Sequence, residues 1–422
     1  MINRRQVLTG ALAAPAMLSV ARVGAAQDVE EVTLKVSTGR VYAEQLAAPF
    51  QEAHPNITVE LSSGGLVFED GSLQTTLQSG EGPDVLTVNS GPGRVGVLAA
   101  TGLILPLDDL YERAGLADVY LPEVMEQLQA QTPDGKIYEV VEGLDVFQFY
   151  YRKDIFDEHG LVPPQTWDEF LAICQTLKDA GTQPIILGAR DNFQGGWLFG
   201  NLVQASAGRE AMTEVIYGEG DFTQPNILRA AELLKQLVDE GYINGLEAAA
   251  LDGDQAQAAF GQAQGGLIVL AQGQVITLGQ DGVDLNLIGS FLLPSLNEGQ
   301  VPAPTAGLAT SWVVNADTGN PEAAKAWMEW SASDEFLAIG IENGGFLVPA
   351  RAIPDGVVLP PTMQDAVDKL AAGAGYNPSV YFSAIAKDAW YAALQMIITG
   401  QASPEQAFAD VQTALVESRS AS

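Results

Sequence analysis

The stretch Val32–Ser37 (VTLKVS) indicates the fold class, because apolar residues alternate with polar ones as in a half-buried β-strand. A predicted helix over residues 42–53 follows it, with apolar residues at helical spacing. Residues 57–61 alternate again, and the apolar run at residues 85–88 predicts a third, buried strand. The order strand, helix, strand, helix, strand predicts a doubly wound α/β lobe.

Later segments mark the starts of further helices. Residues 166–169 (TWDE) form a capping box, in which Thr166 and Glu169 each satisfy a backbone N–H group of the other. Asn320 and Ser403 each precede a proline, which is favoured at the first position of a helix. A chain of 422 residues is too long for a single hydrophobic core, yet no low-complexity linker divides it. We therefore expect two lobes between which the chain crosses more than once.

Composition excludes several classes of function. The formal net charge is -33, and such a chain repels nucleic acid and anionic lipid. The single cysteine, Cys174, lies in an apolar helical run and is expected to be a buried, inert thiol. Only two histidines are present, His54 and His159, and both stand near a predicted helix end. A zinc site and a catalytic triad are therefore not expected, and no cofactor is predicted.

The first 26 residues are expected to be a cleavable export signal. Arg4 and Arg5 precede an uncharged, Ala-rich stretch over residues 9–21, and small residues follow at positions 24–26. The paired arginines resemble a twin-arginine signal, which implies export in the folded state. A general secretory signal remains the alternative. Either route predicts a periplasmic mature protein that starts near Gln27.

Several segments in order resemble one protein family. They are residues 50–59 (FQEAHPNITV), 79–85 (SGEGPDV), 134–138 (DGKIY), 150–156 (YYRKDIF), 160–169 (GLVPPQTWDE) and 400–407 (GQASPEQA). Together they are similar to family 1 extracellular solute-binding proteins, the periplasmic component of carbohydrate ABC importers. Departures from the family pattern are Arg152 in place of an Asn and Val141 in place of a Pro.

This resemblance implies a two-lobed fold like that of type II periplasmic binding proteins. Each lobe would be a doubly wound sheet flanked by helices, and a hinge would join the two. The implied boundaries are residues 27–143 plus 304–350 for the first lobe and 144–303 plus 351–422 for the second. The implied function is a monomeric, non-enzymatic receptor that binds a small carbohydrate between the lobes and delivers it to the transmembrane subunits of an ABC permease.

A carbohydrate site needs planar hydrogen-bonding side chains and aromatic plates in a cleft. Strand ends are the expected positions, because α/β lobes bind ligands at the carboxyl edge of the sheet. Arg40 and Tyr42 follow the first predicted strand, and Asn89, Ser90 and Arg94 follow the third. Each arginine has an alternative interpretation as a surface ion pair, which is easily formed on so acidic a protein.

Further candidates come from the crossing segment and the second lobe. By resemblance Glu142 and Asp145 lie where the chain crosses between lobes, and Asp145 is the better ligand candidate. Asp191 and Asn192 begin a polar, glycine-rich loop that ends at Trp197. Trp197 is expected either to stack on the ligand or to pack in the core.

One family feature is missing. Many carbohydrate-binding members have a Trp where this chain has residues 265–274 (GGLIVLAQGQ), so Gln272 or Gln274 is a candidate replacement. Trp390 on a C-terminal helix is a further candidate, with core packing as the alternative. Two other functions stay open: a receptor for a polyamine or another small polar solute, and an exported carbohydrate-active hydrolase that uses paired carboxylates.

Overall fold

The computed structural model describes residues 31–63, 66, 68, 71–343, 347–371, 373–377 and 382–421. The expected export signal at residues 1–26 lies outside this part of the chain. Within it, no helix is both long enough and apolar enough to cross a bilayer.

Five strands form the first sheet, in the order β2-β1-β3-β10-β4. Their bounds are β1 Val32–Ser37, β2 Ile57–Ser62, β3 Val85–Asn89, β4 Val140–Val141 and β10 Thr310–Val314. The first three strands are parallel to one another, with Val32 opposite Ile57 and Val36 opposite Val85. β10 runs antiparallel to β3 and β4. The three strands predicted from alternation are therefore confirmed.

The second sheet has the order β11-β9-β5-β7-β6, and β8 pairs with β5 in addition. Its strands are β5 Leu144–Arg152, β6 Gln183–Ile185, β7 Gly265–Ala271, β8 Ile288–Phe291, β9 Thr305–Leu308 and β11 Gly375–Tyr376. β6 and β7 are parallel, whereas β5 is antiparallel to β7 and to β9. All seven residues of β7 are buried, as expected for a strand covered on both faces.

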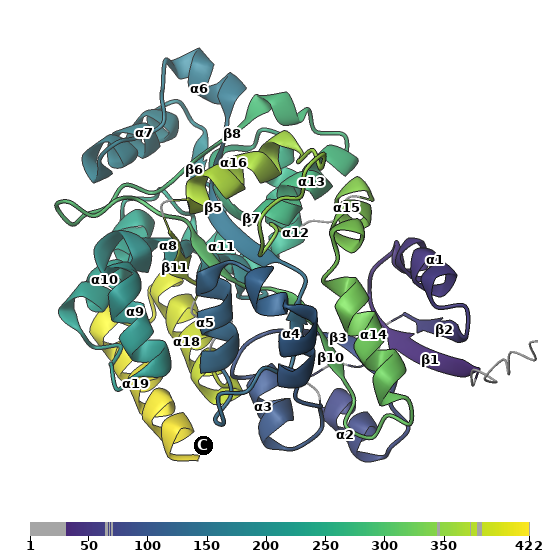
Figure 1. The fold of residues 1–422 in the computed structure, drawn as a ribbon. Coiled ribbons are helices and arrows are strands. Elements are labelled where there is room, and N and C mark those ends of the chain that lie inside the picture. The colour runs from purple at the N-terminus through teal and green to yellow at the C-terminus, as the bar shows by residue number, and fades with distance from the viewer. Residues whose placement is uncertain are drawn as a thin grey trace, which may run out of the picture.

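Helices surround both sheets and confirm the predicted α/β class (Figure 1). Around the first sheet lie α1 Ala43–Ala53, α2 Ser72–Gln78, α3 Val95–Ala100, α4 Asp108–Ala114, α5 Pro122–Ala130, α14 Pro321–Ser331 and α15 Asp334–Glu342. Around the second lie α6 Lys153–His159, α7 Trp167–Asp179, α8 Phe193–Ser206, α9 Gly208–Tyr217, α10 Pro225–Asp239, α11 Gly245–Ala250, α12 Gly253–Gly261, α13 Gln272–Gln280, α16 Pro361–Leu370, α18 Ala384–Ile398 and α19 Pro404–Ala421. The predicted starts at Pro321 and Pro404 are confirmed.

Local sequence explains several of these helix ends. The hydroxyl of Thr166 accepts from the Glu169 backbone N–H at 3.2 Å, and the Glu169 carboxylate accepts from the Thr166 backbone N–H at 3.2 Å. This confirms the predicted capping box at the start of α7. α6 ends at Gly160, whose φ of 64° is the left-handed conformation that glycine adopts without steric cost.

Apolar side chains cover both faces of each sheet, and one cluster extends from the first sheet to Leu144 and Leu308 of the second. In β10, Trp312 packs with α1 and α14, while the adjacent Val313 faces α2 and α3. In β7, Val269 packs against α8 and α10, and Ile268 packs against α12 and α13. Cys174 is fully buried in the second core, as predicted, and burial raises the pKa of its thiol far above the ordinary value.

Three chain segments pass between the sheets, and hydrogen bonds join them. The first runs from β4 to β5 through Glu142 and Gly143, and the second runs from β9 to β10 through Ala309. The Ala309 backbone N–H donates to the Gly143 carbonyl at 3.1 Å. The third segment contains Val348, which exchanges two backbone hydrogen bonds of 2.7 and 3.0 Å with Leu144. These segments form the joint that the two-lobed interpretation requires.

The sheets divide the chain close to the expected lobe boundaries, with one difference. β9 was expected in the first lobe, which began again at residue 304. Instead it is hydrogen-bonded to β5 and β11 in the second sheet, and the chain returns to the first sheet only after Ala309. The lobe boundaries themselves stay a prediction.

Candidate ligand-binding site

The carboxyl ends of β1 and β3 border a cavity of about 320 Å³. Three of the predicted residues line it: Arg40 after β1, Asn89 at the end of β3, and Arg94 before α3. Asn89 is exposed, although it pairs with Thr310 of β10. The cavity therefore offers amide and guanidinium groups at the sheet edge where α/β lobes bind ligands.

Arg40 reaches the first crossing segment. Its guanidinium forms an ion pair with Glu142, and the two side chains are only 11 % and 8 % exposed. Burial is the largest single influence and lowers the pKa of Arg40, but the charge and hydrogen bond of Glu142, together with Tyr42 and Asp145, outweigh it, so the pKa of Arg40 lies above its ordinary value. The second oxygen of Glu142 is buried and has no hydrogen-bond partner among the described residues. The pair links the end of β1 to the joint between the sheets.

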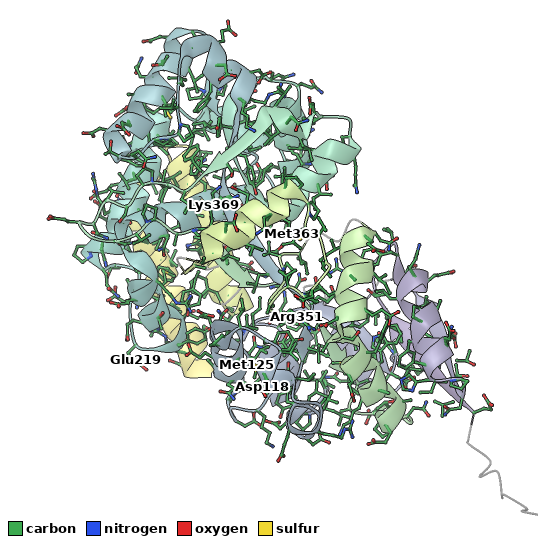
Figure 2. The ribbon with its side chains drawn as sticks, turned by 45° about the horizontal axis from the view of Figure 1, so that its top comes forward. Asp118, Met125, Glu219, Arg351, Met363 and Lys369 are labelled. Atoms are coloured by element: carbon green, nitrogen blue, oxygen red, sulfur yellow. The ribbon has the colours of Figure 1, made fainter. Side chains whose placement is uncertain are left out.

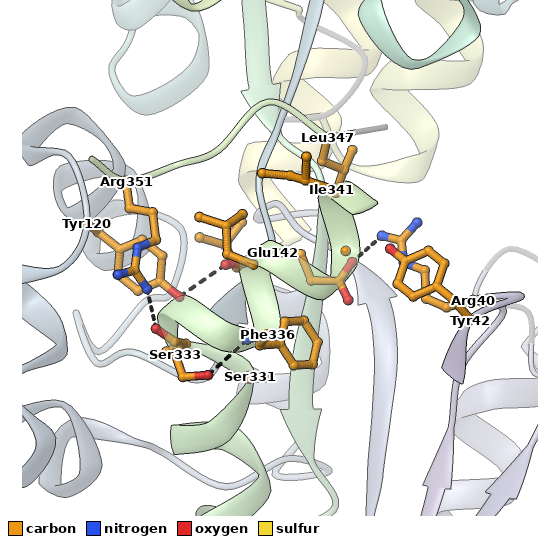
Figure 3. Close-up of a pocket in the computed structure, with 14 residues that line it drawn as sticks. Arg40, Tyr42, Tyr120, Glu142, Ser331, Ser333, Phe336, Ile341, Leu347 and Arg351 are labelled. Atoms are coloured by element: carbon orange, nitrogen blue, oxygen red, sulfur yellow. Dashed lines mark hydrogen bonds and ion pairs between the residues drawn. The ribbon is translucent and has the colours of Figure 1, made fainter. Parts of the chain in front are cut away.

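A second, smaller cavity of about 50 Å³ shares Arg40 with the first (Figure 3). Tyr42 and Glu142 also line it, so three predicted residues meet here. Its walls include Tyr120, whose hydroxyl donates to the Val141 carbonyl at 3.0 Å. Burial raises the pKa of Tyr42 above its ordinary value, and its hydroxyl is protonated at neutral pH. Arg40 thus lines both cavities, and Glu142 lines the second.

Asp145 lies on β5, directly opposite Gly307 of β9. Glycine has no side chain, so nothing on β9 shields the carboxylate from that side. Enclosure by the surrounding protein raises the pKa of Asp145 to about 6, although the positive charge of Arg40 works in the opposite direction. A carboxylate with such a pKa changes charge near neutral pH and is a strong hydrogen-bond acceptor when ionised.

Trp197 is half-buried on the same side of the second sheet as Asp145. Its ring stacks on Phe147, with centroids 5.0 Å apart and planes inclined by 28°. Phe147 is two residues beyond Asp145 on β5, and side chains two apart on a strand share a face. Trp197 therefore fits both core packing and ligand stacking: one part of its side chain packs on Phe147, and the rest stays accessible.

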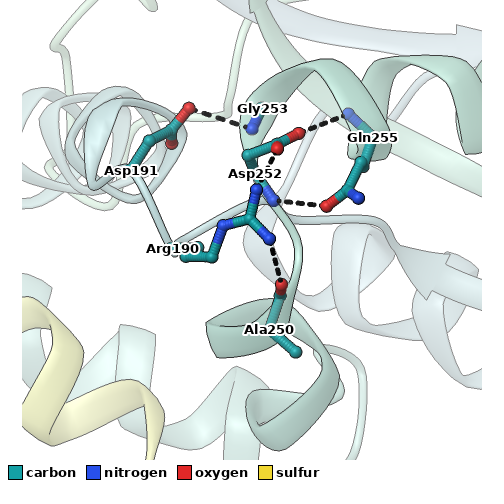
Figure 4. A network of polar contacts seen from close by, with 6 residues as sticks. All are labelled: Arg190, Asp191, Ala250, Asp252, Gly253 and Gln255. Carbon is teal, nitrogen blue, oxygen red and sulfur yellow. Dashed lines mark hydrogen bonds and ion pairs between the residues drawn. The ribbon is translucent and has the colours of Figure 1, made fainter.

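Asp191 and Asn192 precede α8, and Figure 4 shows Asp191 with its partner Gly253. One Asp191 oxygen accepts from the Gly253 backbone N–H at 3.1 Å, while the other is buried without a partner among the described residues. Asn192 adopts a left-handed φ of 70° and accepts from the Gln395 amide at 2.8 Å. Beside them, Arg190 forms an ion pair with Asp252, the N-cap of α12. Both predicted residues thus hold this loop in place.

The two glutamines that follow β7 differ in their surroundings. Gln274 turns back along its helix and accepts from the Ala271 backbone N–H at 3.3 Å. Gln272 is 1 % exposed, and neither atom of its amide has a hydrogen-bond partner in the described chain. An unsatisfied buried amide is costly. Of the two, Gln272 is the one whose amide oxygen and nitrogen can still form hydrogen bonds to a ligand.

Two predicted site residues are core residues. The Ser90 hydroxyl is fully buried and donates to Glu139 at 3.0 Å. Burial raises the pKa of Glu139 to about 7, although the hydrogen bond from Ser90 works in the opposite direction. Trp390 is likewise fully buried, and its ring packs against Phe199 and Phe382. Neither residue lines either of the two cavities described above, so the structure gives no support to the site role predicted for them.

Sequence reasoning missed the threonines of the first cavity. Thr38, Thr87 and Thr310 line it together with the predicted residues. Thr38 directly follows β1, and position after this strand was the observation that selected Arg40, so it could have selected Thr38 as well. Thr310 opens β10, after the second crossing, and no motif marked it. Within the described chain, no group of three or more His, Cys, Asp or Glu side chains has the arrangement of a metal site.

Comparison with known proteins settles the family. The model of the bacterial extracellular solute-binding protein family matches residues 36–336, which is more than half of the chain. The chain belongs to this family. The family is one of binding proteins, and its extracellular location agrees with the export signal expected from the sequence.

Individual relatives are distant. An uncharacterized ABC transporter extracellular-binding protein of Pyrococcus horikoshii is 26 % identical over 304 residues, which span 69 % of this chain and 64 % of that protein. The melibiose/raffinose/stachyose-binding protein MelE of Bacillus subtilis is 23 % identical over 338 residues, 77 % of this chain and 73 % of its own. A solved chitin oligosaccharide binding protein gives a TM-score of 0.79 at 23 % identity and covers 92 % of this chain and 99 % of its own. That likeness confirms the two-lobed α/β fold.

Proposed function

We propose that this solute-binding protein captures a carbohydrate between its two lobes and delivers it to the transmembrane subunits of an ABC permease. The observation that carries the proposal is the cavity at the carboxyl ends of β1 and β3, where Arg40, Asn89 and Arg94 present hydrogen-bonding groups. Two relatives support the ligand class, since their names state that they bind oligosaccharides.

The second lobe would contribute an acceptor and an aromatic plate. Asp145 accepts sugar hydroxyls once ionised, and the accessible part of Trp197 offers a ring for the apolar face of a pyranose. Gln272 is the candidate for the position where many family members have a Trp. A ligand held by both lobes stabilises the closed arrangement by its differential affinity for that state.

A polyamine is the weaker candidate ligand. Such a cation needs several carboxylates around aromatic rings, but Arg40 already neutralises Glu142, which leaves Asp145. A hydrolase that uses these two carboxylates meets the same difficulty, because an acid paired with an arginine is a poor proton donor. We therefore infer a receptor without catalytic activity. We further infer that it acts as a monomer in the periplasm and that the twin-arginine route exports it.

A thermal-shift screen tests the ligand class. Ligands that bind only the native state raise the melting temperature, by an amount that grows with concentration over Kd. We expect mono- or oligosaccharides to raise it, while putrescine and spermidine leave it unchanged. A shift with polyamines alone would overturn the carbohydrate assignment. Release of reducing sugar from the bound oligosaccharide during overnight incubation would instead reveal a hydrolase.

The export route has its own test. Replacing Arg4 and Arg5 by Lys should block export of the twin-arginine type, and mass spectrometry of the wild-type exported protein should find residues 1–26 removed. Unchanged export of the double variant would assign the general secretory route.

A further inference from the structure

A cavity of about 370 Å³ lies beside the joint between the sheets. Leu121 and Val124, from the start of α5, line one part of it, and Val367 and Leu370 of α16 line another. Figure 2 labels Met125 of α5 and Met363 and Lys369 of α16, with Arg351 between the two helices in that view. Leu144 lines the cavity, and its neighbour Asp145 points to the other face of β5, since successive side chains alternate. The cavity therefore lies on the opposite face of β5 from Asp145, and it shares Arg351 with the second cavity of the candidate site.

One cation in this cavity has no counter-charge among the described residues. The Arg209 guanidinium donates to the Ala374 carbonyl at 2.8 Å and to the Tyr376 hydroxyl at 3.1 Å, and it lies 4.6 Å from the centre of the Tyr376 ring. Both acceptors are neutral, and no carboxylate of the described chain forms an ion pair with Arg209. On a protein of net charge -33, an arginine without an acid is unexpected.

The hydrogen bonds hold Arg209 in a fixed orientation and leave further N–H groups unused, because a guanidinium has five. A planar guanidinium held in this orientation can donate two parallel hydrogen bonds to two oxygens of one anion. Arg351 adds a second positive charge to the lining, although Asp334 pairs with it. Glu123, the one acid among the lining residues, has an exposed side chain.

We propose that this cavity is a second binding site, which takes a small organic anion with an apolar body and a carboxylate or sulfonate group. The anionic group pairs with Arg209, and the apolar body packs between α5 and α16. A volume of about 370 Å³ is large enough for a small-molecule ligand. The proposal does not depend on the carbohydrate function.

Two fluorescent probes with the same ring system test the site. 8-Anilinonaphthalene-1-sulfonate carries the anionic group, and N-phenyl-1-naphthylamine lacks it. We expect the sulfonate to bind the wild-type protein at one site and at least about tenfold more tightly than the neutral probe, since charge-assisted hydrogen bonds are the stronger kind. Equal affinity for the two probes would show that Arg209 recognises no anion and would overturn the proposal.

Three variants locate the binding. Arg209→Gln should weaken sulfonate binding about tenfold and leave the neutral probe unaffected. Arg229→Gln makes the same charge change on the exposed face of α10, where Arg229 pairs with Glu232, and should leave both affinities unchanged. Val367→Trp should fill the cavity and abolish binding of both probes. Unchanged sulfonate binding in Arg209→Gln or in a folded Val367→Trp would place the probe elsewhere and contradict the site.

Discussion

Arg40 and Glu142 form a nearly buried ion pair that fastens the end of β1 to the first segment crossing between the sheets. Arg40 lines both cavities of the candidate site and places a positive charge near Asp145. It therefore connects the fold, the joint and the candidate site, and the electrostatics of the site depend on it.

Breaking this pair should destabilise the protein. Arg40→Gln leaves the Glu142 charge buried without compensation, so we expect a loss of about 3 kcal/mol in the free energy of unfolding. The double variant Arg40→Gln/Glu142→Gln should lose less than the two single variants added together. Urea denaturation measures all three. Arg229→Gln, which breaks an exposed pair, serves as the control and should lose less than about 1 kcal/mol.

Carbohydrate affinity should depend on pH through Asp145. Its pKa is about 6, so affinity should rise as the pH increases through 6 and the carboxylate becomes a charged acceptor. Stability should change in the opposite direction: a folded-state pKa raised above the ordinary value makes the ionised group destabilising, and stability falls as the pH rises from about 4 to about 6. Titration calorimetry between pH 5 and 8 checks the affinity. Asp145→Asn should remove this pH dependence, and a profile shared with the wild type would exclude Asp145 from the site.

The two tryptophans should respond differently to truncation. Trp197→Ala should weaken carbohydrate binding by about 1–3 kcal/mol, because an accessible aromatic plate is lost. Trp390→Ala removes a fully buried ring and should lower the free energy of unfolding by about 3–5 kcal/mol. Calorimetry and melting curves of the ligand-free proteins separate the two effects. Normal binding by Trp197→Ala would remove that residue from the site.

Gly143 is a point of close approach within the joint. A Cβ there would lie 2.7 Å from both the Leu347 Cβ and the Val348 carbonyl oxygen, so Gly143→Ala must displace the third crossing segment. We expect a loss of about 1–3 kcal/mol in stability, as for other overpacked sites. Gly39→Ala is the matched control, because a Cβ at Gly39 meets nothing within 4 Å. Equal melting temperatures for the two variants would show that the joint tolerates the displacement.

Much of the fold could be predicted from local pattern, because alternation in Val32–Ser37 and the capping box at Thr166 are properties of a few neighbouring residues. The site was harder to predict. Ser90 and Asn89 are adjacent at the end of β3, yet only Asn89 reaches the cavity, since Ser90 turns inward to Glu139. Trp390 resembled a ligand plate in sequence, but packing of α18 against α8 buries it. Such orientations depend on tertiary contacts that one strand or helix does not encode.

In the proposed function a carbohydrate is held between two lobes that close on it. Small-angle X-ray scattering, with and without a saturating carbohydrate from the thermal-shift screen, detects this closure. We predict a smaller radius of gyration in the saturated protein, because a ligand that contacts both lobes favours the closed state. An unchanged radius of gyration at saturation would contradict capture between moving lobes.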